Sequence, residues 1–378
     1  MMLEIVSFRP HVIANGTAFE AQAKIYKYLQ RKYGWKFKII QSEEDNFKDD
    51  ELEVYSVSES SLRTFKGTNL LVQPRKFNNE IVSLAKGSDV ILGCDPTIYS
   101  EGYLAYNLSK KIGAKLIYDA SVTTFSTANG LKWKFKKGLV NKTINGADLI
   151  WITVPKVAER FANMRLENTS FLGKSVVLGH PVDINDKRPR NDNQINVLTV
   201  SRLVMEKGVH YIIKALSPLI KQNRNIQLNI LGDGNAKSFL EKIIMEEGIK
   251  DNVKFIMPVH HNKIKEHYYN ADILVTHPIS NSHWEEFFGV VNLEGMSFGL
   301  PVVTTKSGGI SYVLREKGIA RLIPERDIVA LTSEIENLIY DRNFRDKIGE
   351  NGHRFVKENY SIEVIAEKYR GYIEALFK

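Results

Sequence analysis

Short apolar runs rich in Val, Ile and Leu alternate along the whole chain with longer amphipathic segments. The runs have the length of buried strands, and the segments have the length of helices that cover a sheet. In the first half, the pattern predicts strands at Leu3–Ser7, Phe37–Gln41, Asp89–Leu92, Lys115–Tyr118 and Leu149–Thr153. Helices fill the gaps, and one of them, Tyr99–Ile112, is expected to end at Gly113. The acidic stretch Ser42–Tyr55 interrupts this order, and we expect it to be a solvated loop.

The pattern restarts in the second half after a polar stretch with two prolines, "GHPVDINDKRPRNDNQ" (Gly179–Gln194). This stretch is the best linker candidate in the chain. Strands are then predicted at Ile195–Val200, Gln227–Leu231, Val253–Met257, Ile273–Thr276 and Pro301–Thr304. From Asp327 onward, the amphipathic pattern predicts helices to the end of the chain.

Strands that alternate with helices form parallel sheets covered on both faces, which indicates the α/β class. With 378 residues, of which 43% are hydrophobic, the chain is longer than one core usually supports. We therefore expect two doubly wound, Rossmann-like domains, residues 1–180 and residues 181–358, that face each other across a cleft. Ligands of such sheets bind where the carboxyl ends of the strands open into a crevice.

Charge and cysteine content narrow the class of partner. The formal net charge is +8 and the pI is about 9.2, which favours anionic ligands. A nucleic-acid partner would need a stacking sheet or a basic recognition helix, and because neither is evident we expect no nucleic acid. Cys94 is the single cysteine, no apolar segment has the length of a membrane span, and no series of zinc ligands occurs. These features indicate a cytoplasmic protein without a metal site.

The first candidate site residues follow the strand Ile195–Val200. This strand leads into "SRLVMEKGVHYIIKAL", which puts Arg202 at its end and Lys207 before a helix that opens at Gly208. Two cations at the crevice suit a diphosphate, because Arg holds two oxygens with its planar fork and Lys supplies a compact charge. Taken alone, an Arg and a Lys in a loop are more often ordinary surface charges.

The stretch "EEFFGVVNLEGMSFGLPVV" adds two acids to these cations. Glu286 precedes the Phe288-Gly289 turn, and Gly289 lets the backbone approach a ligand as the next helix starts. The N–H groups of Gly289 and Val290 would then face the crevice and bind an anion. Glu294 lies five residues beyond Gly289, roughly 8 Å along the helix. The alternative is that Glu286 caps the helix and Glu294 is an ordinary surface residue.

Carboxylates accept hydrogen bonds from vicinal hydroxyl groups. The two acids therefore fit a sugar on one side of a diphosphate and a ribose on the other. A glycine pair, Gly308-Gly309, follows the next strand and again opens a helix. Three such turns in the same half favour a binding site over ordinary surface chemistry.

These residues give the second half a resemblance to the donor domain of retaining GT-B glycosyltransferases, specifically glycosyltransferase family 4. The similar stretches are "SRLVMEKGVHYIIKA", "ILGDGNAKSFLEKI", "EEFFGVVNLEGMSFGLPVVTTKSGG" and "GENGHRFVKENYSIEVIAEKY". The resemblance implies that Glu286 holds the transferred sugar, Glu294 holds the nucleotide ribose, and Arg202 and Lys207 neutralise the diphosphate. It also implies a metal-independent hexosyltransferase that uses a UDP-, GDP- or other nucleotide sugar, retains the anomeric configuration and needs no cofactor.

The first half resembles the acceptor domain of that family more loosely. The resemblance puts Gly16, in "IANGTAFE", at the glycine loop that approaches the diphosphate. It also implies that a last helix, residues 359–378, crosses back to the first domain. Family members often carry a His after the strand that here reads "LIYDAS", which makes Tyr118, Asp119 and Ser121 the candidates for contact with the sugar.

The acceptor stays open, and a glycan, a lipid-linked sugar and a small molecule all fit. His283 and Trp284 lie near the expected sugar pocket, where they either select the sugar or pack the loop. Tyr312 stands where the family commonly has a Glu, which leaves that contact open as well.

Two stretches, Lys24–Lys38 and Leu131–Lys142, interleave lysines with aromatic residues. Such stretches can bind anionic membrane surfaces, which would make the protein peripheral at the cytoplasmic face of a membrane. The favoured alternative is that the lysines face solvent while the apolar residues pack inward. In that case the buried side chains are Tyr26, Leu29, Trp133 and Leu139.

Two other functions compete with glycosyl transfer. An epimerase or a phosphorylase of similar fold would act on sugar phosphates, but the pair of Glu286 and Glu294 argues against the first. A phosphorylase would need a much longer chain with a pyridoxal-binding lysine. The main alternative is a catalytically silent module that binds nucleotide sugars, because the acceptor side departs from the family pattern.

Overall fold

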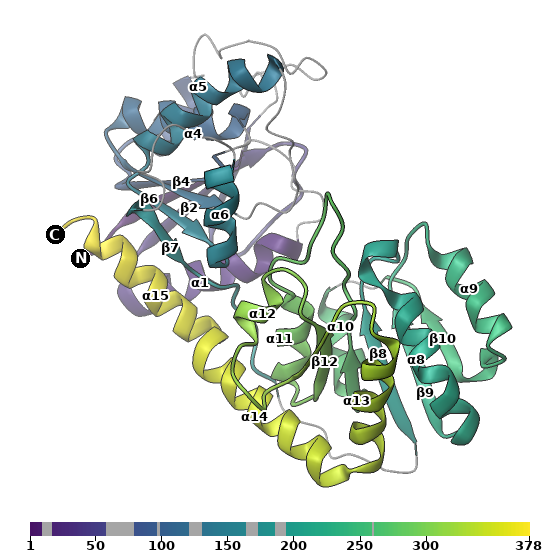
Figure 1. Cartoon of the computed structure of the whole chain (residues 1–378). Coiled ribbons are helices and arrows are strands. Elements are labelled where there is room, and N and C mark those ends of the chain that lie inside the picture. Colours follow the sequence, from purple (N-terminus) through teal and green to yellow (C-terminus); the bar gives the residue numbers. More distant parts are fainter. Residues whose placement is uncertain are drawn as a thin grey trace. The chain divides into compact units, whose positions relative to one another are not determined.

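The structure, a computed structural model, describes residues 1–9, 17–57, 79–96, 99–120, 131–163, 173–185, 194–258 and 261–378. These residues divide into two units, each built around its own parallel sheet (Figure 1). The first unit holds the described residues up to Pro181 together with Ile362–Lys378, and the second holds those from Val182 to Ser361. The predicted α/β class with two doubly wound domains is confirmed.

The sheet of the first unit has seven strands in the order β3-β2-β1-β4-β5-β6-β7. The strands are β1 Glu4–Arg9, β2 Lys36–Ser42, β3 Glu53–Val57, β4 Val90–Gly93, β5 Lys115–Ala120, β6 Leu149–Ile152 and β7 Ser175–Val177. The helices are α1 Thr17–Tyr33, α3 Asn79–Ala85, α4 Tyr99–Ile112, α5 Leu131–Gly146, α6 Pro155–Asn163 and α15 Ile362–Ala375. The final helix therefore belongs to the first unit, where it packs on α1.

The sheet of the second unit has six strands in the order β10-β9-β8-β11-β12-β13. The strands are β8 Ile195–Val200, β9 Ile226–Leu231, β10 Val253–Ile256, β11 Ile273–Val275, β12 Val302–Thr305 and β13 Arg321–Ile323. The α-helices are α8 Val209–Gln222, α9 Lys237–Glu246, α10 His261–Tyr269, α11 Val290–Ser297, α12 Ile310–Val313, α13 Ile328–Tyr340 and α14 Arg342–Tyr360. Two 3-10 turns, η1 Met205–Lys207 and η2 Lys250–Asn252, precede α8 and β10.

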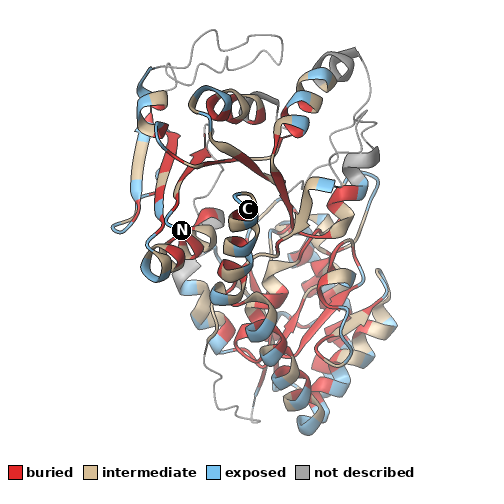
Figure 2. Ribbon diagram, turned by 90° about the vertical axis from the view of Figure 1, so that its left-hand side faces the viewer, coloured by how far each residue is buried: buried red, intermediate tan, exposed pale blue. Residues whose placement is uncertain are grey.

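The central strands are buried on both faces, as expected for parallel sheets that helices cover. Every residue of β4, β6 and β12 is buried, and Figure 2 shows the strands of each sheet mostly in the colour of buried residues. Apolar side chains of this kind stabilise a fold by about 1.5–3 kcal/mol each when they are fully buried. The near-continuous Val, Ile and Leu runs in the sequence are therefore the cores of the two sheets.

Three short strands, β3, β7 and β13, were not predicted from the sequence. The prediction of a solvated loop over Ser42–Tyr55 is confirmed only for residues 43–52, most of whose acids are exposed. The stretch ends in β3, and it buries Asp45, Phe47 and Leu52. Asp45 is buried at the end of β2 and pairs with the buried guanidinium of Arg9 at 3.3 Å. The acidic stretch therefore closes one end of the sheet around an internal ion pair.

Other local predictions are confirmed. Helix α4 ends at Ile112, and Gly113 adopts the left-handed conformation (φ 78°) while its N–H donates to the carbonyl of Ser109. Tyr26 and Leu29 are fully buried, so the apolar residues of the first basic stretch pack inward. The side chain of Trp133 lies outside the described residues.

The expected linker, Gly179–Gln194, lies partly outside the described residues. Its described part is fastened within the second unit from Val182 onward. Asp183 pairs with Lys265 at 2.7 Å, and the side-chain amide of Asn185 donates to Ser297 Oγ at 3.1 Å. These contacts hold residues 183–185 against α10 and α11.

The sheets of both units carry the same pair of aspartate hydrogen bonds at the amino ends of their strands. An Asp directly before a strand donates its backbone N–H to a carbonyl on the neighbouring strand and accepts that residue's N–H with its carboxylate. All six hydrogen bonds are 2.8 Å long. The pairs are Asp89 with Glu4, Asp148 with Leu116, and Asp272 with Asn196. Each pair fixes the register of two neighbouring strands near their amino ends, and register decides which side chains face the core.

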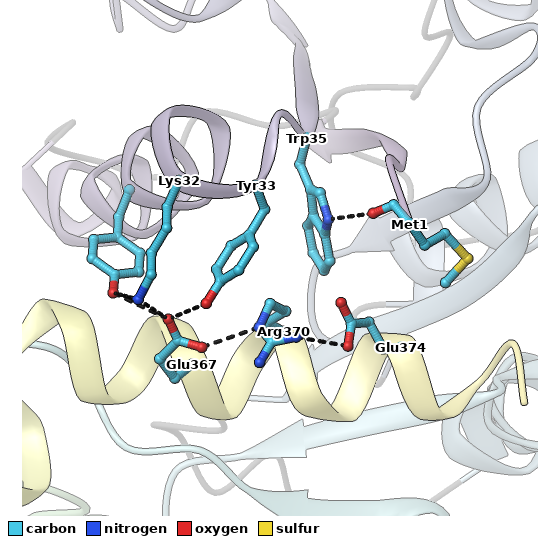
Figure 3. A network of polar contacts seen from close by, with 8 residues as sticks. Met1, Lys32, Tyr33, Trp35, Glu367, Arg370 and Glu374 are labelled. Carbon is cyan, nitrogen blue, oxygen red and sulfur yellow. Dashed lines mark hydrogen bonds and ion pairs between the residues drawn. The ribbon is translucent and has the colours of Figure 1, made fainter.

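Helix α15 is held on α1 by a polar network centred on Glu367 (Figure 3). The Glu367 carboxylate accepts hydrogen bonds from Lys32 Nζ (2.8 Å), Tyr33 Oη (2.6 Å) and Tyr28 Oη (3.1 Å) on α1. It also accepts one from Arg370 Nε (3.0 Å) on its own helix. Partial burial opposes ionisation, but these donors outweigh it and lower the pKa of Glu367 to about 2.

Replacing Glu367 by Gln is expected to destabilise the protein by about 1 kcal/mol near neutral pH, because solvent screens this partly exposed network. The folded pKa of about 2 lies below the ordinary value of 4.5. The carboxylate therefore stabilises fully above about pH 4.5, and this contribution disappears as the pH falls toward 2. Unfolding free energies of both proteins from pH 7 to 3 should converge on the acid side. The exposed Glu363→Gln on the same helix serves as the control, and a constant gap would contradict the assignment.

Candidate functional site

The candidate site lies at the switch point of the second sheet, where the strand order reverses between β8 and β11. In sheets of this type the crevice at the carboxyl ends of such neighbouring strands is the usual ligand site. Two loops leave these strand ends, residues 201–208 after β8 and residues 276–289 after β11. A hydrogen bond of 2.8 Å from the N–H of Ile279 to the carbonyl of Glu206 joins them.

The two loops bring Lys207 and Glu286 into direct contact, although 79 residues separate them in the chain. The Lys207 ammonium donates to the Glu286 carboxylate, and it lies 4.8 Å from the centre of the Trp284 ring. The side chains of Lys207 and Glu286 are 20% and 21% exposed. The cation is thus held between a carboxylate and an aromatic face at a site that solvent still reaches.

The turn that carries Trp284 is fixed by Asn281. The side-chain carbonyl of Asn281 accepts the N–H groups of His283 (2.7 Å) and Trp284 (2.8 Å). The N–H of Asn281 donates in turn to the carbonyl of Trp284 at 2.8 Å. Trp284 is half-buried over Lys207, whereas His283 is exposed and bonds only locally, to Ser282 Oγ at 2.6 Å.

Close backbone approaches make glycine necessary at two positions of the site. Gly208 adopts φ +63°, and a Cβ there would lie 1.9 Å from the carbonyl oxygen of His277. Gly308 adopts φ +51°, and a Cβ there would lie 1.9 Å from the carbonyl oxygen of Glu286. The same Glu286 carbonyl accepts the N–H of Gly309 at 2.8 Å. Three loops therefore pack backbone against backbone around Glu286, which leaves its side chain little freedom.

Helix α11 starts beside this cluster. Gly289 adopts the left-handed conformation (φ 72°) before the first helical residue, Val290. The N–H groups of Gly289 and Val290 donate to no acceptor among the described residues, and both residues are partly exposed. Phe288 is different, because its side chain is buried with its ring 5.7 Å from that of Tyr360. The Phe288 side chain is therefore part of the packing of this unit.

Glu294 lies on the second turn of α11 and is oriented by a residue that was not predicted. The hydroxyl of Tyr268, on α10, donates to Glu294 Oε2 at 2.7 Å. The Tyr268 ring is buried and stacks on Phe298 with ring centres 5.6 Å apart. Burial and the nearby charge of Glu294 raise the pKa of Tyr268 well above its usual value, so the hydroxyl stays protonated. The second oxygen of Glu294 remains for another donor.

A buried network fastens the start of the 276–289 loop to the loop after β13. His277 is fully buried, and its Nε2 accepts the N–H of Arg326 at 3.1 Å. Burial, with a smaller effect of His210, lowers the pKa of His277 to about 4. The ring is therefore neutral at physiological pH. Glu325 accepts the N–H (2.8 Å) and hydroxyl (2.6 Å) of Ser280.

Two other predicted residues of the second half stand apart from the ion pair. Arg202 lies on the same loop as Lys207, but its side chain is exposed and contacts no polar or charged group of the described residues. Tyr312 is half-buried on α12 with the Arg315 guanidinium 4.5 Å from its ring centre. The Gly308-Gly309 turn precedes α12, a helix of four residues.

The structure describes only some of the predicted residues of the first half. Gly16 and Ser121 lie outside the described residues. Tyr118 is fully buried and donates its hydroxyl to the carbonyl of Gly102 at 2.5 Å, so it is a core residue and not a sugar contact. Asp119 is half-buried and faces a pocket of the first unit.

The described residues show neither a cluster of metal ligands nor a helix that could span a membrane. Across the described ranges, no three His, Cys, Asp or Glu side chains are grouped so that they could hold a metal ion. Within the same ranges, every helix is too short or too polar to cross a lipid bilayer.

Comparison with known proteins relates the second half of the chain to glycosyl transferases. Residues 183–355 match the family model of glycosyl transferases group 1. An uncharacterised glycosyltransferase of Methanocaldococcus jannaschii is 29% identical over 177 residues, covering 47% of this chain and 44% of the relative. A lipopolysaccharide core biosynthesis glycosyltransferase of Rhizobium meliloti is 27% identical over 227 residues, covering 59% of this chain and 63% of the relative. The chain spans about half the length of the curated relatives it matches.

Among solved structures, the Anabaena HepE protein in complex with UDP and glucose superimposes with a TM-score of 0.71 at 18% identity. The match covers 99% of this chain and 100% of HepE, so both units take part in the likeness. Residues 183–355 are therefore similar to glycosyl transferases group 1, and the chain as a whole has the GT-B fold.

Proposed function

We propose that this protein is a retaining glycosyltransferase of family 4 that moves a hexose from a nucleotide-diphosphate sugar to a hydroxyl acceptor. The observation that carries the proposal is the contact of Lys207 with Glu286 and Trp284 at the switch point, next to the open amino end of α11. The HepE neighbour was solved with UDP and glucose, which supports a nucleotide sugar as the donor here.

In the proposed complex, the donor separates the ion pair. The diphosphate takes Lys207, together with Arg202 and the N–H groups of Gly289 and Val290. The sugar hydroxyls then bind the carboxylate that Lys207 releases, Glu286. The ribose hydroxyls bind the oxygen of Glu294 that Tyr268 leaves available. Lys207 and Glu286 thus each exchange one partner for another, which limits the cost of desolvation.

The same arrangement favours the transition state. Glycosyl transfer develops positive charge at the anomeric carbon and negative charge on the leaving diphosphate. A fixed cation stabilises that leaving group more in the transition state than in the bound donor. We assign this neutralisation to Lys207 and Arg202 rather than to a metal ion, and the leaving phosphate oxygen accepts the proton of the acceptor hydroxyl.

For the acceptor we propose a sugar-bearing molecule, either a glycan or a lipid-linked sugar. The relative in Rhizobium meliloti acts in lipopolysaccharide core biosynthesis, which favours this class. We also propose a cytoplasmic location, with peripheral contact to the cytoplasmic membrane face. The buried aromatic residues of Lys24–Lys38 leave its lysines as the part of that stretch that would reach a membrane.

A donor screen tests the proposal. Purified protein is incubated with UDP-glucose, UDP-galactose, UDP-N-acetylglucosamine and GDP-mannose, and release of free nucleotide is measured together with the thermal shift. A transferase should hydrolyse one donor slowly and release a sugar with the anomeric configuration of the donor. Tight binding of a donor without any release or transfer to a panel of acceptor glycans would instead identify the silent binding module.

Tyr268→Phe gives a finer test of the role of Glu294. This change removes one hydroxyl and keeps the buried ring on Phe298. Loss of a hydrogen bond to a charged group costs about 1.5–3 kcal/mol, so the KM for the donor should rise roughly 10- to 100-fold while kcat changes little. Glu294→Ala should raise the KM at least as much.

The neighbouring Tyr269 provides the matched control. It is exposed on the same helix, and Tyr269→Phe should leave both constants unchanged. A normal donor KM in Tyr268→Phe and Glu294→Ala would remove Glu294 from the donor site.

A further inference from the structure

A pocket lies within the first unit, and no residue from the loops of the candidate site lines it. Its volume is about 70 Å³, several times what one water molecule needs. Helices α1 and α15, the ends of β5 and β6, and the segment that ends at Pro181 form its walls. Asp119, a candidate for contact with the sugar, lines this pocket, whereas Arg202, Lys207, Glu286 and Glu294 lie in the other unit.

Two buried hydrogen-bond donors line the pocket and make no hydrogen bond of ordinary geometry with the described residues. Trp151, at the end of β6, is 3% exposed, and its Nε1–H donates to no acceptor in the part of the chain that the structure describes. Tyr369, on α15, is 1% exposed, and its hydroxyl interacts with that of Tyr26 but makes no hydrogen bond of ordinary geometry with the described residues. The two rings touch, with centres 4.2 Å apart. Buried N–H and O–H groups in folded proteins are nearly always paired with protein, water or ligand, so this pair indicates an occupant with acceptor atoms.

Other lining groups exclude an anion as that occupant. The carboxylate of Asp119 faces the pocket and would repel a second negative charge. His180 also lines it, and burial lowers the pKa of this imidazole, so the ring supplies no positive charge at neutral pH. Burial likewise raises the pKa of Tyr369 well above its usual value, which keeps its hydroxyl a donor.

The remaining walls define the class of ligand. A hydroxyl group both accepts and donates, so it can bond Trp151 and Tyr369 with its oxygen and Asp119 with its hydrogen. The amide of Gln22 adds a further donor and acceptor, and Ile25 offers an apolar surface for C–H groups. We propose that this pocket binds a compact polyol group through Trp151, Tyr369 and Asp119. The group comes either from a free small polyol or from the edge of a sugar ring.

The four tryptophans of the chain make a direct test possible, because each contributes one indole N–H signal in the NMR spectrum of ¹⁵N-labelled protein. The Trp151 signal is assigned with Trp151→Phe. Glycerol and erythritol are then titrated as free polyols, methyl glucoside and methyl galactoside as sugar rings, and inorganic phosphate as an anion. We expect a saturable shift of the Trp151 signal with one of the first two groups, and the responding group identifies the source.

Three variants test whether the shift of the Trp151 signal comes from binding in this pocket. Ala21→Phe, on α1, fills the cavity and should abolish the shift. Tyr369→Phe removes one hydroxyl and should weaken the apparent affinity roughly three- to tenfold. Tyr372→Phe, on the same helix but outside the pocket, should bind like the unchanged protein. If Ala21→Phe does not fold, Tyr369→Phe and its control still decide the question.

Several outcomes would overturn the inference. A Trp151 signal that no polyol or glycoside shifts, or that shifts equally in Ala21→Phe, would mean that the cavity holds water only. A shift with phosphate alone would mean that the cavity binds an anion and not a polyol. The Trp284 signal is independent, because Trp284 contacts Lys207 in the other unit and should respond to a nucleotide diphosphate. Failure of the polyol site and failure of the donor site are therefore distinguishable in one experiment.

Discussion

Replacing Lys207 by alanine is expected to lower kcat by about two to three orders of magnitude, equivalent to about 2.7–4 kcal/mol of transition-state stabilisation. The donor KM should change less, because Arg202 and the open amino end of α11 still bind the diphosphate. The physical reason is that the leaving group gains negative charge only as the glycosidic bond breaks. Steady-state rates with the donor found in the screen check this, and Lys207→Arg should recover part of the activity.

A matched control separates this effect from the loss of any lysine ion pair. Lys221 pairs with Glu247 at 3.3 Å in the same unit but away from the switch point. Lys221→Ala should leave kcat and KM unchanged, since an exposed pair contributes at most about 1 kcal/mol to stability and none to transfer. An unimpaired kcat in folded Lys207→Ala would contradict the assignment of Lys207 to the leaving group.

Gly208→Ala is expected to cause the largest loss of stability among single changes at the site. The new Cβ would have to lie 1.9 Å from the His277 carbonyl oxygen, so the loops after β8 and β11 must separate. We expect about 3–5 kcal/mol of destabilisation, in the range of severe core substitutions. Activity should fall as well, because Lys207 and Glu286 lie on the two loops that would move apart.

Gly248→Ala is the control for backbone strain. Gly248 has nearly the same φ, +65°, but no atom lies within 4 Å of the position of its Cβ. Left-handed backbone costs an alanine about 1–2 kcal/mol, and this should be the whole effect at Gly248. Urea unfolding of both variants measures the difference. Equal losses would show that strain, and not the contact of the two loops, requires glycine at position 208.

Most of the fold could be predicted from hydrophobic periodicity, and the strands that were missed share one property. β3, β7 and β13 are all edge strands, paired on one side only. Their sequences, EVYSV, SVV and RLI, are short and mostly half-buried, whereas every residue of β4 is buried. An edge strand buries less apolar surface, so it lacks the continuous apolar run by which a central strand is recognised.

The sequence was sufficient to predict which residues form the candidate site, but not which of their side chains contact each other. Sequence order at strand ends is sufficient to put Lys207 and Glu286 at one crevice. It does not reveal that they pair with each other, because that depends on the positions of two loops. The contact of Tyr268 with Glu294 was missed for a related reason. Adjacent Tyr268 and Tyr269 look alike in sequence, and only the packing of α10 decides which of them faces inward.

The aspartates that precede β4, β6 and β11 have a consequence for how such a protein can change. They fix strand register at the edge of each sheet opposite to the binding loops. An insertion or exchange within residues 276–289 would therefore leave Asp272 and its partner Asn196 aligned. New donor preferences can arise by changes in the loops at the carboxyl ends of the strands, while the aspartates at the amino ends preserve the alignment of the strands.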